Sequence, residues 1–534
     1  MSNTIEAAAL KAEIHQAARG ERELALLDIR EHGQYGGGHP FFAVSCPYSV
    51  IELRAPVLVP RRSASVVVFD DDDGVAEKAQ AALGRIGYSD VRILKGGAPG
   101  WEAAGYTLYQ GVNLPSKTFG ELVEIACHTP SITAAELHQM QSDGDNMILL
   151  DGRTPEEYAN FNIPGGISCP NAELPLRFDE LVQDPDTTVV INCAGRTRSI
   201  IGAQTLIDFG VSQKVVALEN GTQGWALIDL ELENGADRFA PNTLSADTMT
   251  AAKQHADALV AARDIAFVEH DTLTEWLNDA ARTTYLVDVR SRQEFESGHL
   301  PDARHAPGGQ LVQAADLSVG VHGSRIVVCD DSEVRAVMAA HWLKQMGRDV
   351  YVLKGGIGDA ATATGAVSAQ LDDGVAPDLG KTTVEDLVAG LGDGAMVAID
   401  VRSSQDYRDG HALGARWCLR PQMDDAREYM QGKAVVLIAN DDSTARLAAL
   451  DAVAAGASHV TQLAGGMASW ADAGHAVEQS TDDPDDPNRK DYLFFTGGRH
   501  MGVKEHMRQY LEWEIGLVGQ LDADERAAFK LPGD

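Results

Sequence analysis

The stretch Val189-Val190-Ile191-Asn192-Cys193-Ala194-Gly195-Arg196-Thr197-Arg198-Ser199 contains the pattern that predicts the fold. Its β-branched residues predict a strand from Thr188 to Asn192, and the residues from Ser199 to Phe209 have the pattern of a helix. Cys193 would then lie at the carboxyl end of a strand, in a loop that leads into a helix. We therefore expect an α/β fold with this cysteine at the sheet edge where ligands usually bind.

The loop after Cys193 has the residues of an anion site beside a thiolate. The N–H groups at a helix N-terminus favour negative charge, and Arg196 and Arg198 would add two cations. A thiol with an ordinary pKa of about 8.5 is only about 3% ionised at pH 7, so such surroundings would supply more of the nucleophilic form. We predict that Cys193 is a catalytic nucleophile. The alternative is a buried structural cysteine, because free cysteines are often buried.

The composition excludes several classes of function. A chain of 534 residues corresponds to about three to five domains, and 44% apolar residues suffice for packed cores. The formal net charge of −35 disfavours binding to nucleic acid or to anionic membranes. The start of the chain has no signal-peptide pattern and no long apolar run occurs, so we expect a cytoplasmic protein. The six cysteines form no CxxC pair or zinc-like cluster, so we expect reduced thiols and neither metal nor cofactor.

Four segments of the chain share the same order of short motifs. Each has an Asp-x-Arg tripeptide after an apolar stretch, at Asp28–Arg30, Asp151–Arg153, Asp288–Arg290 and Asp400–Arg402. A Gly-His pair follows in three of them, with His39, His299 and His411, and Asn162 stands at this place in the second. Helical patterns such as Thr133 to Gln141 and Thr382 to Leu391 alternate with strand patterns such as Lys214 to Leu218. This alternation predicts four domains, each with a mainly parallel sheet covered by helices on both faces.

These motifs, in this order, resemble the rhodanese family, whose domains carry Asp-x-Arg, Gly-His-x-Pro-Gly-Ala, a catalytic loop that begins with Cys, and a late Gly-Gly-x3-Trp. The resemblance implies an α/β chain of four tandem rhodanese-like three-layer α/β/α domains with a C-terminal helical tail. We expect these parts at residues 1–110, 131–235, 265–365 and 380–480, with a docking extension at 481–534. The segments Gly111 to Pro130, Asn234 to Asp264 and Ala366 to Gly380 would be linkers.

Only the second copy has a cysteine at the start of this loop. Aligned by the preceding strand and the following helix, Cys193 falls opposite Asp70, Asp330 and Asp441. Acidic side chains there would repel an anion, so we expect domain 2 alone to be catalytic and the other three domains to be degenerate. Cys329 precedes Asp330 by one residue, and its use as a second nucleophile is the alternative.

Three sets of recurring residues are predicted to be structural because they occur in copies that lack a loop cysteine. They are the histidines His39, His299 and His411, the Asp-x-Arg residues such as Asp151 and Arg153, and the small residues Cys46, Cys169, Ala306 and Cys418. A resolving role for Cys169 stays open, because it shares a domain with Cys193.

Loop length separates two reactions that proteins of this kind catalyse. The similar dual-specificity phosphatases have five residues between Cys and Arg, whereas four residues separate Cys193 from Arg198. The shorter loop favours attack on the outer sulfur of thiosulfate. The resemblance therefore implies a thiosulfate sulfurtransferase: Cys193 takes the sulfur as a persulfide, sulfite leaves, and cyanide or a thiol accepts the sulfur.

The resemblance also assigns roles within the loop. The substrate-binding residues would be Ala194, Gly195, Arg196, Thr197, Arg198 and Ser199, with the two arginines on the sulfonate oxygens and the amides of residues 194–199 on the thiolate or persulfide. Ala194 departs from the Cys-Arg-x-Gly loop of tandem two-domain enzymes, so the donor is not fixed beyond a small anion. The alternative function is a regulatory persulfide relay between protein partners. The sequence does not decide whether the chain forms a homodimer.

The tail has two features of its own. The aromatic strip Tyr492-Leu493-Phe494-Phe495 precedes an amphipathic stretch from Val503 to Leu517, which predicts a docking helix. The simplest interpretation is packing between domains. A second hypothesis is that Arg499 and His500 are brought to the mouth of the Cys193 pocket.

Overall fold

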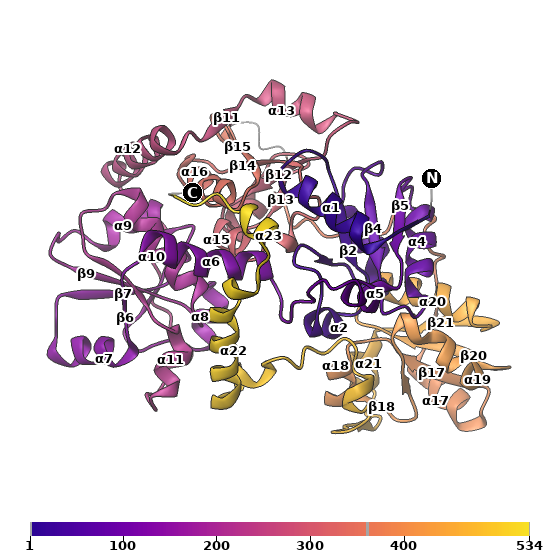
Figure 1. Ribbon diagram of the computed structural model, residues 1–534. Coiled ribbons are helices and arrows are strands. Elements are labelled where there is room, and N and C mark those ends of the chain that lie inside the picture. Colours follow the sequence, from indigo (N-terminus) through magenta and orange to yellow (C-terminus); the bar gives the residue numbers. More distant parts are fainter. Residues whose placement is uncertain (1–2, 359–362, 533–534) are drawn as a thin grey trace. The chain divides into compact units, whose positions relative to one another are not determined.

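The computed structural model describes residues 3–358 and 363–532 (Figure 1). Four five-stranded sheets follow one another along the chain, and we number their domains 1 to 4 in chain order. Two compact units result: one contains Met1–Leu10, Ala25–Val112 and Ser368–Phe495, and the other contains Lys11–Leu24, Asn113–Val367 and Thr496–Asp534. Domain 1 is thus grouped with domain 4, and domain 2 with domain 3 and the tail.

The first unit contains two of the sheets. Domain 1 has the strands β1 (Thr4–Ile5), β2 (Ala25–Asp28), β3 (Val44–Ser45), β4 (Val66–Phe69) and β5 (Val91–Leu94), and the helices α2 (His32–Gly37), α3 (Ile51–Leu58), α4 (Val75–Arg85) and α5 (Gly97–Ala103). Domain 4 has β16 (Gly380–Thr382), β17 (Met396–Asp400), β19 (Arg416–Trp417), β20 (Ala434–Ile438) and β21 (His459–Leu463), with α17 (Val384–Asp393), α18 (Ser404–Asp409), α19 (Arg427–Met430), α20 (Asp442–Ala454) and α21 (Gly466–Asp472). The strands β18 (His411–Ala412) and β22 (Val477–Glu478) pair separately, and α1 spans Ala7–Ala18.

The second unit contains the Cys193 loop, which we define as residues 193–199. Domain 2 has β6 (Ser131–Ile132), β7 (Met147–Asp151), β8 (Ile167–Ser168), β9 (Thr188–Asn192) and β10 (Val215–Leu218), with α6 (Leu114–Cys127), α7 (Ala134–Asp143), α8 (Pro155–Asn160), α9 (Leu174–Leu181), α10 (Thr197–Phe209) and α11 (Gly221–Leu227). Domain 3 has β11 (Ala266–Val268), β12 (Thr284–Asp288), β13 (Arg304–His305), β14 (Arg325–Cys329) and β15 (Asp349–Leu353), with α12 (Ala246–Arg263), α13 (His270–Leu277), α14 (Arg292–Ser297), α15 (Gly308–Gln313) and α16 (Val334–Gln345). The tail contributes α22 (Lys504–Gly516) and α23 (Ala523–Ala527).

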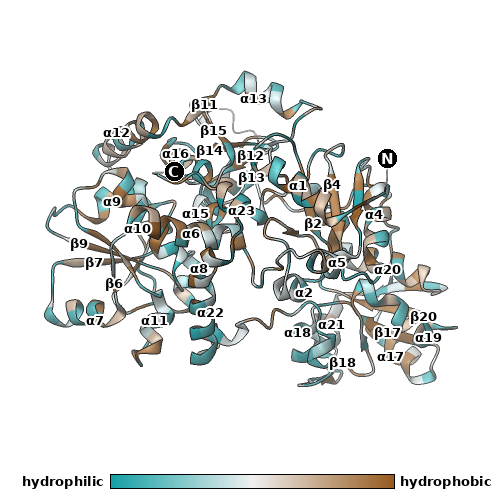
Figure 2. Cartoon of the chain, in the orientation of Figure 1, coloured by the Kyte–Doolittle hydropathy of each residue, from teal (hydrophilic) through white to brown (hydrophobic). Residues whose placement is uncertain are grey.

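All four large sheets have the same strand order and are parallel throughout. In domain 2 the order is β6-β10-β9-β7-β8, and the corresponding strands of the other domains follow the same sequence. The central strands are apolar and buried because helices cover both faces, as the brown strands and the mostly teal α7 of Figure 2 show. The predicted four-domain α/β architecture is confirmed. Among the described residues, every helix is too short or too polar to traverse a lipid bilayer.

Local sequence signals explain where the helices begin. Thr133 caps α7 and Thr154 caps α8, each with a glutamate three residues later that completes a capping box. The predicted strand from Thr188 to Asn192 is confirmed as β9. The predicted start of the following helix was wrong: α10 begins at Thr197, so Thr197 and Arg198 belong to its first turn.

Two of the predicted linkers are largely helical. The segment 111–130 contains α6 and the segment 234–264 contains α12. Leu114, Phe119, Leu122 and Val123 of α6 are buried, and α6 packs along α10. Its polar residues gave this segment the composition of a linker, although one face belongs to the core next to the Cys193 loop.

Strand register corrects one part of the loop alignment. Asp151 of the Asp-x-Arg strand pairs with Asn192, and the equivalent Asp400 pairs with Ile438. The residue opposite Cys193 in domain 4 is therefore Ala439, not Asp441 as predicted. Asp441 instead caps α20 by accepting a hydrogen bond from the Thr444 amide at 2.8 Å. Only residues 439–441 separate β20 from α20 in domain 4. An alignment that relies on the following helix does not reveal this short loop.

The recurring residues form the same contacts in each copy. The arginine of every Asp-x-Arg tripeptide binds its own aspartate and donates to a carbonyl eight residues further on, at Gly38, Phe161, Gly298 and Gly410. His39, His299 and His411 stack on Tyr35, Phe295 and Tyr407, and Asn162 replaces them by donating to the Tyr158 carbonyl. These sets therefore have the structural role that was predicted for them.

Candidate active site

Cys193 follows the last residue of β9, in the middle of the domain 2 sheet. Its carbonyl accepts a hydrogen bond from the Thr222 amide at 2.8 Å. Gly221 lies directly against that carbonyl: a Cβ at this position would be 2.2 Å from the oxygen, and its φ of 52° also favours glycine. The turn before α11 thereby fixes the backbone of Cys193.

The Cys193 loop presents a series of free backbone donors. Within the described part of the chain, no acceptor is found for the N–H groups of residues 194–199. Those of Thr197, Arg198 and Ser199 belong to the first turn of the 13-residue helix α10, where intrahelical partners do not exist. The Ser199 hydroxyl donates to Cys193 Sγ at 3.2 Å. A thiol in this position has hydrogen-bond donors on the loop side and a helix N-terminus beside it, which suits an anion.

Arg198 is already bound to a carboxylate. Its guanidinium makes two hydrogen bonds to Glu157, with lengths of 2.6 and 2.8 Å. Burial disfavours the ionised form of Glu157, but the hydrogen bonds and charge of Arg198 outweigh this effect and lower the Glu157 pKa to about 2. Glu157 is also the glutamate that completes the capping box of α8, so the pair ties α10 to α8.

Arg196 has carboxylate partners on a different element. It donates to Glu121 at 2.8 and 2.9 Å and also to Glu124, both on α6. The sequence prediction brought Arg196 and Arg198 together as anion ligands. In the structure they diverge, because one guanidinium pairs with α6 and the other with α8.

The tail helix α22 packs against the same loop. Glu514, which is fully buried, accepts a hydrogen bond from the Thr197 hydroxyl at 2.6 Å and lies 3.2 Å from Lys117 Nζ. Lys117 also donates to the Tyr510 hydroxyl at 2.7 Å. Burial disfavours the charged Lys117, yet Glu514 and Tyr510 outweigh this and raise its pKa. The predicted tail helix therefore contacts the Cys193 loop directly.

Arg499 and His500 lie at the edge of this region. The His500 ring is 6.1 Å from the Phe161 ring, measured between centroids, and Arg499 lies over the ring of Tyr510 at 4.6 Å. Burial lowers the His500 pKa to about 4, with Arg499 acting in the same direction. A neutral His500 near neutral pH would not add positive charge at the loop.

The other five thiols have surroundings that disfavour a thiolate. Burial raises the pKa of Cys46 and Cys418 to about 12, and it also raises the pKa of Cys127, Cys169 and Cys329. Cys46, Cys169 and Cys418 each donate their amide to the carbonyl of the Asp-x-Arg aspartate, as Ala306 does. These positions are packed and equivalent, as the repeat predicted.

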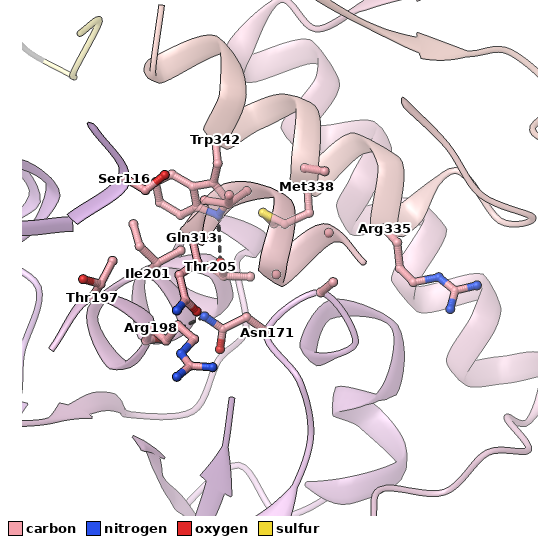
Figure 3. A pocket seen from close by; sticks show the side chains of 15 residues that line it. Ser116, Asn171, Thr197, Arg198, Ile201, Thr205, Gln313, Arg335, Met338 and Trp342 are labelled. Atoms are coloured by element: carbon pink, nitrogen blue, oxygen red, sulfur yellow. Dashed lines mark hydrogen bonds between the residues drawn. The ribbon is translucent and has the colours of Figure 1, made fainter. Parts of the chain in front are cut away.

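Two cavities lie near the loop within the second unit. One cavity, of about 20 Å³, lies between α10, α15 and α16, and Arg198 is among the residues that line it (Figure 3). Beside it, the Trp342 indole donates a hydrogen bond to the Thr205 hydroxyl. This cavity has room for about one water molecule. The other, of about 700 Å³, is lined by Arg153, Arg198 and Phe239 together with residues of domain 3, including Arg292 and Gln310. Arg198 thus faces the larger space from the loop.

Sequence reasoning did not find the partners that surround the loop. Glu157 had a signal, since it is the fourth residue of a Thr-x-x-Glu capping box and this box recurs in domain 3. Lys117, Glu121 and Glu514 had none, because they come from segments outside the domain 2 repeat.

Comparison with known proteins agrees with the fold and the repeats. The family model for the Rhodanese-like domain matches residues 7–104, 133–227, 269–361 and 383–473. A crystal structure of a thiosulfate sulfurtransferase from Pseudomonas aeruginosa is 39% identical, covers 99% of each chain and superposes with a TM-score of 0.91.

Two curated relatives match shorter parts of the chain. A sulfurtransferase from Allochromatium vinosum is 34% identical over 95 residues, which is 18% of this chain and 86% of that protein. An HTH-type transcriptional regulator from Mycobacterium tuberculosis is 35% identical over 106 residues, 20% of this chain and less than half of its own length, 46%. The four family matches together span most of the sequence, and the chain belongs to the rhodanese-like family.

Proposed function

We propose that the protein is a sulfurtransferase that carries sulfane sulfur as a persulfide on Cys193. The observation that carries this proposal is the Cys193 loop, where one thiol follows a strand and the next six residues have backbone N–H groups without acceptors in the described part of the chain. The likeness over the whole chain to the P. aeruginosa thiosulfate sulfurtransferase supports thiosulfate as the donor.

The reaction has two balanced steps. The Cys193 thiolate attacks the outer sulfur of thiosulfate, the sulfur–sulfur bond of thiosulfate breaks, and sulfite leaves with that electron pair. Cyanide or a thiolate then attacks the outer sulfur of the persulfide, which forms thiocyanate or a new persulfide and restores the Cys193 thiolate. The loop amides stabilise the negative sulfur in both states, because they are fixed before the charge arrives.

The arginines have a narrower role than the sequence indicated. Arg196 already binds a carboxylate of α6, and Arg198 binds a carboxylate of α8. A sulfonate would have to compete with these carboxylates for the guanidinium groups. The backbone amides therefore make the principal contacts with the anion. Arg198, which also lines the larger cavity, contributes positive charge at the start of α10.

Thiocyanate production from thiosulfate and cyanide tests this function. Wild-type protein should turn over, and Cys193→Ala should lose activity by about 10³-fold or more, because no other described thiol replaces the nucleophile. Cys329→Ala is the matched control and should keep full activity. An inactive wild type, or an active Cys193→Ala variant, would refute the proposal and favour a protein-to-protein sulfur relay or another nucleophile.

A further inference from the structure

The helix α22 packs against the outer face of the Cys193 loop. A Cβ placed on Gly195 would meet Tyr510 Cε1 at 3.1 Å, Glu514 Oε2 at 3.3 Å and Gln223 Nε2 at 3.4 Å. Gly195 is two residues after Cys193, so Tyr510 and Glu514 restrict the space beside the loop at this point. The side chain of Cys193 is closed in, with only 2% of the residue exposed.

Buried polar contacts hold α22 in this position. Glu514 binds the Thr197 hydroxyl, 317 residues earlier in the chain, and Lys117 bridges Glu514 and Tyr510. Moving α22 away would break the contacts of Lys117 with both Glu514 and Tyr510. Figure 1 shows α22 alongside α6, which contains Lys117, and alongside α11, which begins at Gly221.

One carboxylate oxygen of this cluster points at the loop without a partner. Glu514 Oε2 is buried and has no hydrogen bond within the described residues, although Oε1 has two neighbours. The space beside Gly195 is therefore bounded by an aromatic ring and a negative oxygen. A large acceptor, above all an anionic one, meets both a steric and an electrostatic obstacle there.

Resting on the proposed function, we propose that Tyr510 limits the size of the acceptor that reaches the Cys193 persulfide. Lys117 and Glu514 act as positioning residues that keep the ring against Gly195. A nucleophile as small as cyanide passes this wall, whereas a thiol on a peptide-sized molecule is disfavoured. The tail helix thus determines specificity in a domain from which it is distant in sequence.

A single-turnover experiment with the full chain separates this specificity from catalysis. The protein is loaded with thiosulfate and freed of excess donor, and the rate of persulfide discharge is measured with cyanide and with glutathione. Tyr510→Ala should raise the glutathione-to-cyanide rate ratio by about tenfold, which corresponds to the removal of a barrier of about 1.4 kcal/mol. Tyr510→Leu, which keeps an apolar contact, should raise it by a smaller factor. Tyr510→Phe keeps the ring but loses the hydrogen bond from Lys117, so it should raise the ratio less than Tyr510→Leu does.

The matched control is Ile515→Ala, on an exposed face of the same helix. It should leave both discharge rates at the wild-type value. An unchanged ratio in both Tyr510→Ala and Tyr510→Leu would overturn the proposal, as would an equal rise in Ile515→Ala, which would indicate general loosening of α22. If wild type loads no persulfide, the proposed function fails, and alkylation of Cys193 by iodoacetamide against a bulky maleimide still tests the size limit in the same variants.

Discussion

The Cys193 loop of domain 2 and the Asp330 loop of domain 3, residues 330–335, are built on the same frame. In each, the residue before the loop pairs with the aspartate of the Asp-x-Arg strand. A glycine with positive φ lies against the carbonyl of the first loop residue, where a Cβ would be 2.2 Å away in both copies. The frame is therefore a property of the fold and does not by itself make a site.

The ion pair of the loop arginine also recurs. Arg198 binds Glu157 in domain 2, and Arg335 binds Glu294 in the same way in domain 3. Burial disfavours ionisation of Glu294, but Arg335 outweighs it and lowers the Glu294 pKa to about 2, as Arg198 does for Glu157. A pair that is present without a loop cysteine serves first to position the loop.

The first residue of the loop is where the two copies differ in chemistry. The Asp330 carboxylate accepts from the Arg335 amide at 3.2 Å and from the Ser332 hydroxyl at 2.8 Å. Asp70 of domain 1 likewise accepts from the amides of Asp72 and Ala76. In these copies the side chain itself supplies the anion, whereas Cys193 leaves the amides of its loop open to a ligand.

The largest expected effect comes from making domain 2 resemble domain 3. Cys193→Asp should lower thiocyanate production by about 10³-fold or more, because the nucleophile is lost and the new carboxylate occupies the loop amides. The thermal unfolding midpoint should not fall, since those amides gain an acceptor. A clear loss of stability would show that the loop amides do not point where this comparison requires.

The reverse exchange tests whether the frame alone suffices. Asp330→Cys should add no activity to the Cys193→Asp background, because Asp331 remains bound to Arg335 and keeps negative charge beside the new thiol. Recovered turnover in the double variant would contradict the view that the composition of the whole loop matters.

The supporting glycines should affect stability in both domains but activity in only one. Gly221→Ala and Gly356→Ala each force a Cβ against a carbonyl at positive φ and should cost about 2–4 kcal/mol of unfolding free energy in urea. Only Gly221→Ala should also reduce kcat, since its carbonyl belongs to Cys193. Equal losses of kcat in the two variants would show that domains 2 and 3 act as one catalytic unit.

The ion pairs allow a finer comparison. Glu157→Gln should lower kcat by about tenfold with little change in KM, because Arg198 and the start of α10 lose their anchor. Glu294→Gln should leave kcat unchanged. A lower KM for thiosulfate in Glu157→Gln would instead indicate that Glu157 competes with the donor for Arg198.

The smallest effect concerns the histidine that domain 2 replaces by Asn162. Burial lowers the His39 pKa to about 3, below the value of about 6.5 in an unfolded chain. The unfolded state therefore binds more protons between these values, and stability falls as the pH drops below about 6.5, by at most about 1.4 kcal/mol per pH unit. His39→Asn should make the midpoint of urea unfolding depend less on pH between pH 7 and pH 5. An unchanged slope would assign the pH dependence to other groups.

Most of the fold was predictable because its signals are local. The strand ending at Asn192, the cap at Thr133 and the repeated Asp-x-Arg tripeptides need only neighbouring residues to be recognised. The equivalence of Ala439 and Cys193 was missed because it depends on strand register, which one sequence does not specify.

The candidate site was predictable only in its central part. The loop from Cys193 to Ser199 is contiguous, so its thiol, amides and hydroxyl could be placed together from sequence. The carboxylates that bind Arg196 come from α6, and Tyr510 comes from α22. Both helices are brought to the loop by tertiary packing alone. The first segment has the composition of a linker, and the second was predicted only as an amphipathic docking helix, so neither sequence identified these partners of the loop.

The most direct test of the central claim is to locate the persulfide by mass spectrometry after brief incubation with thiosulfate and alkylation. We expect one additional sulfur atom on the peptide that contains Cys193 and none on the peptides that contain Cys46, Cys127, Cys169, Cys329 or Cys418. Additional sulfur on the Cys329 peptide, or its absence from the Cys193 peptide in an active sample, would contradict it.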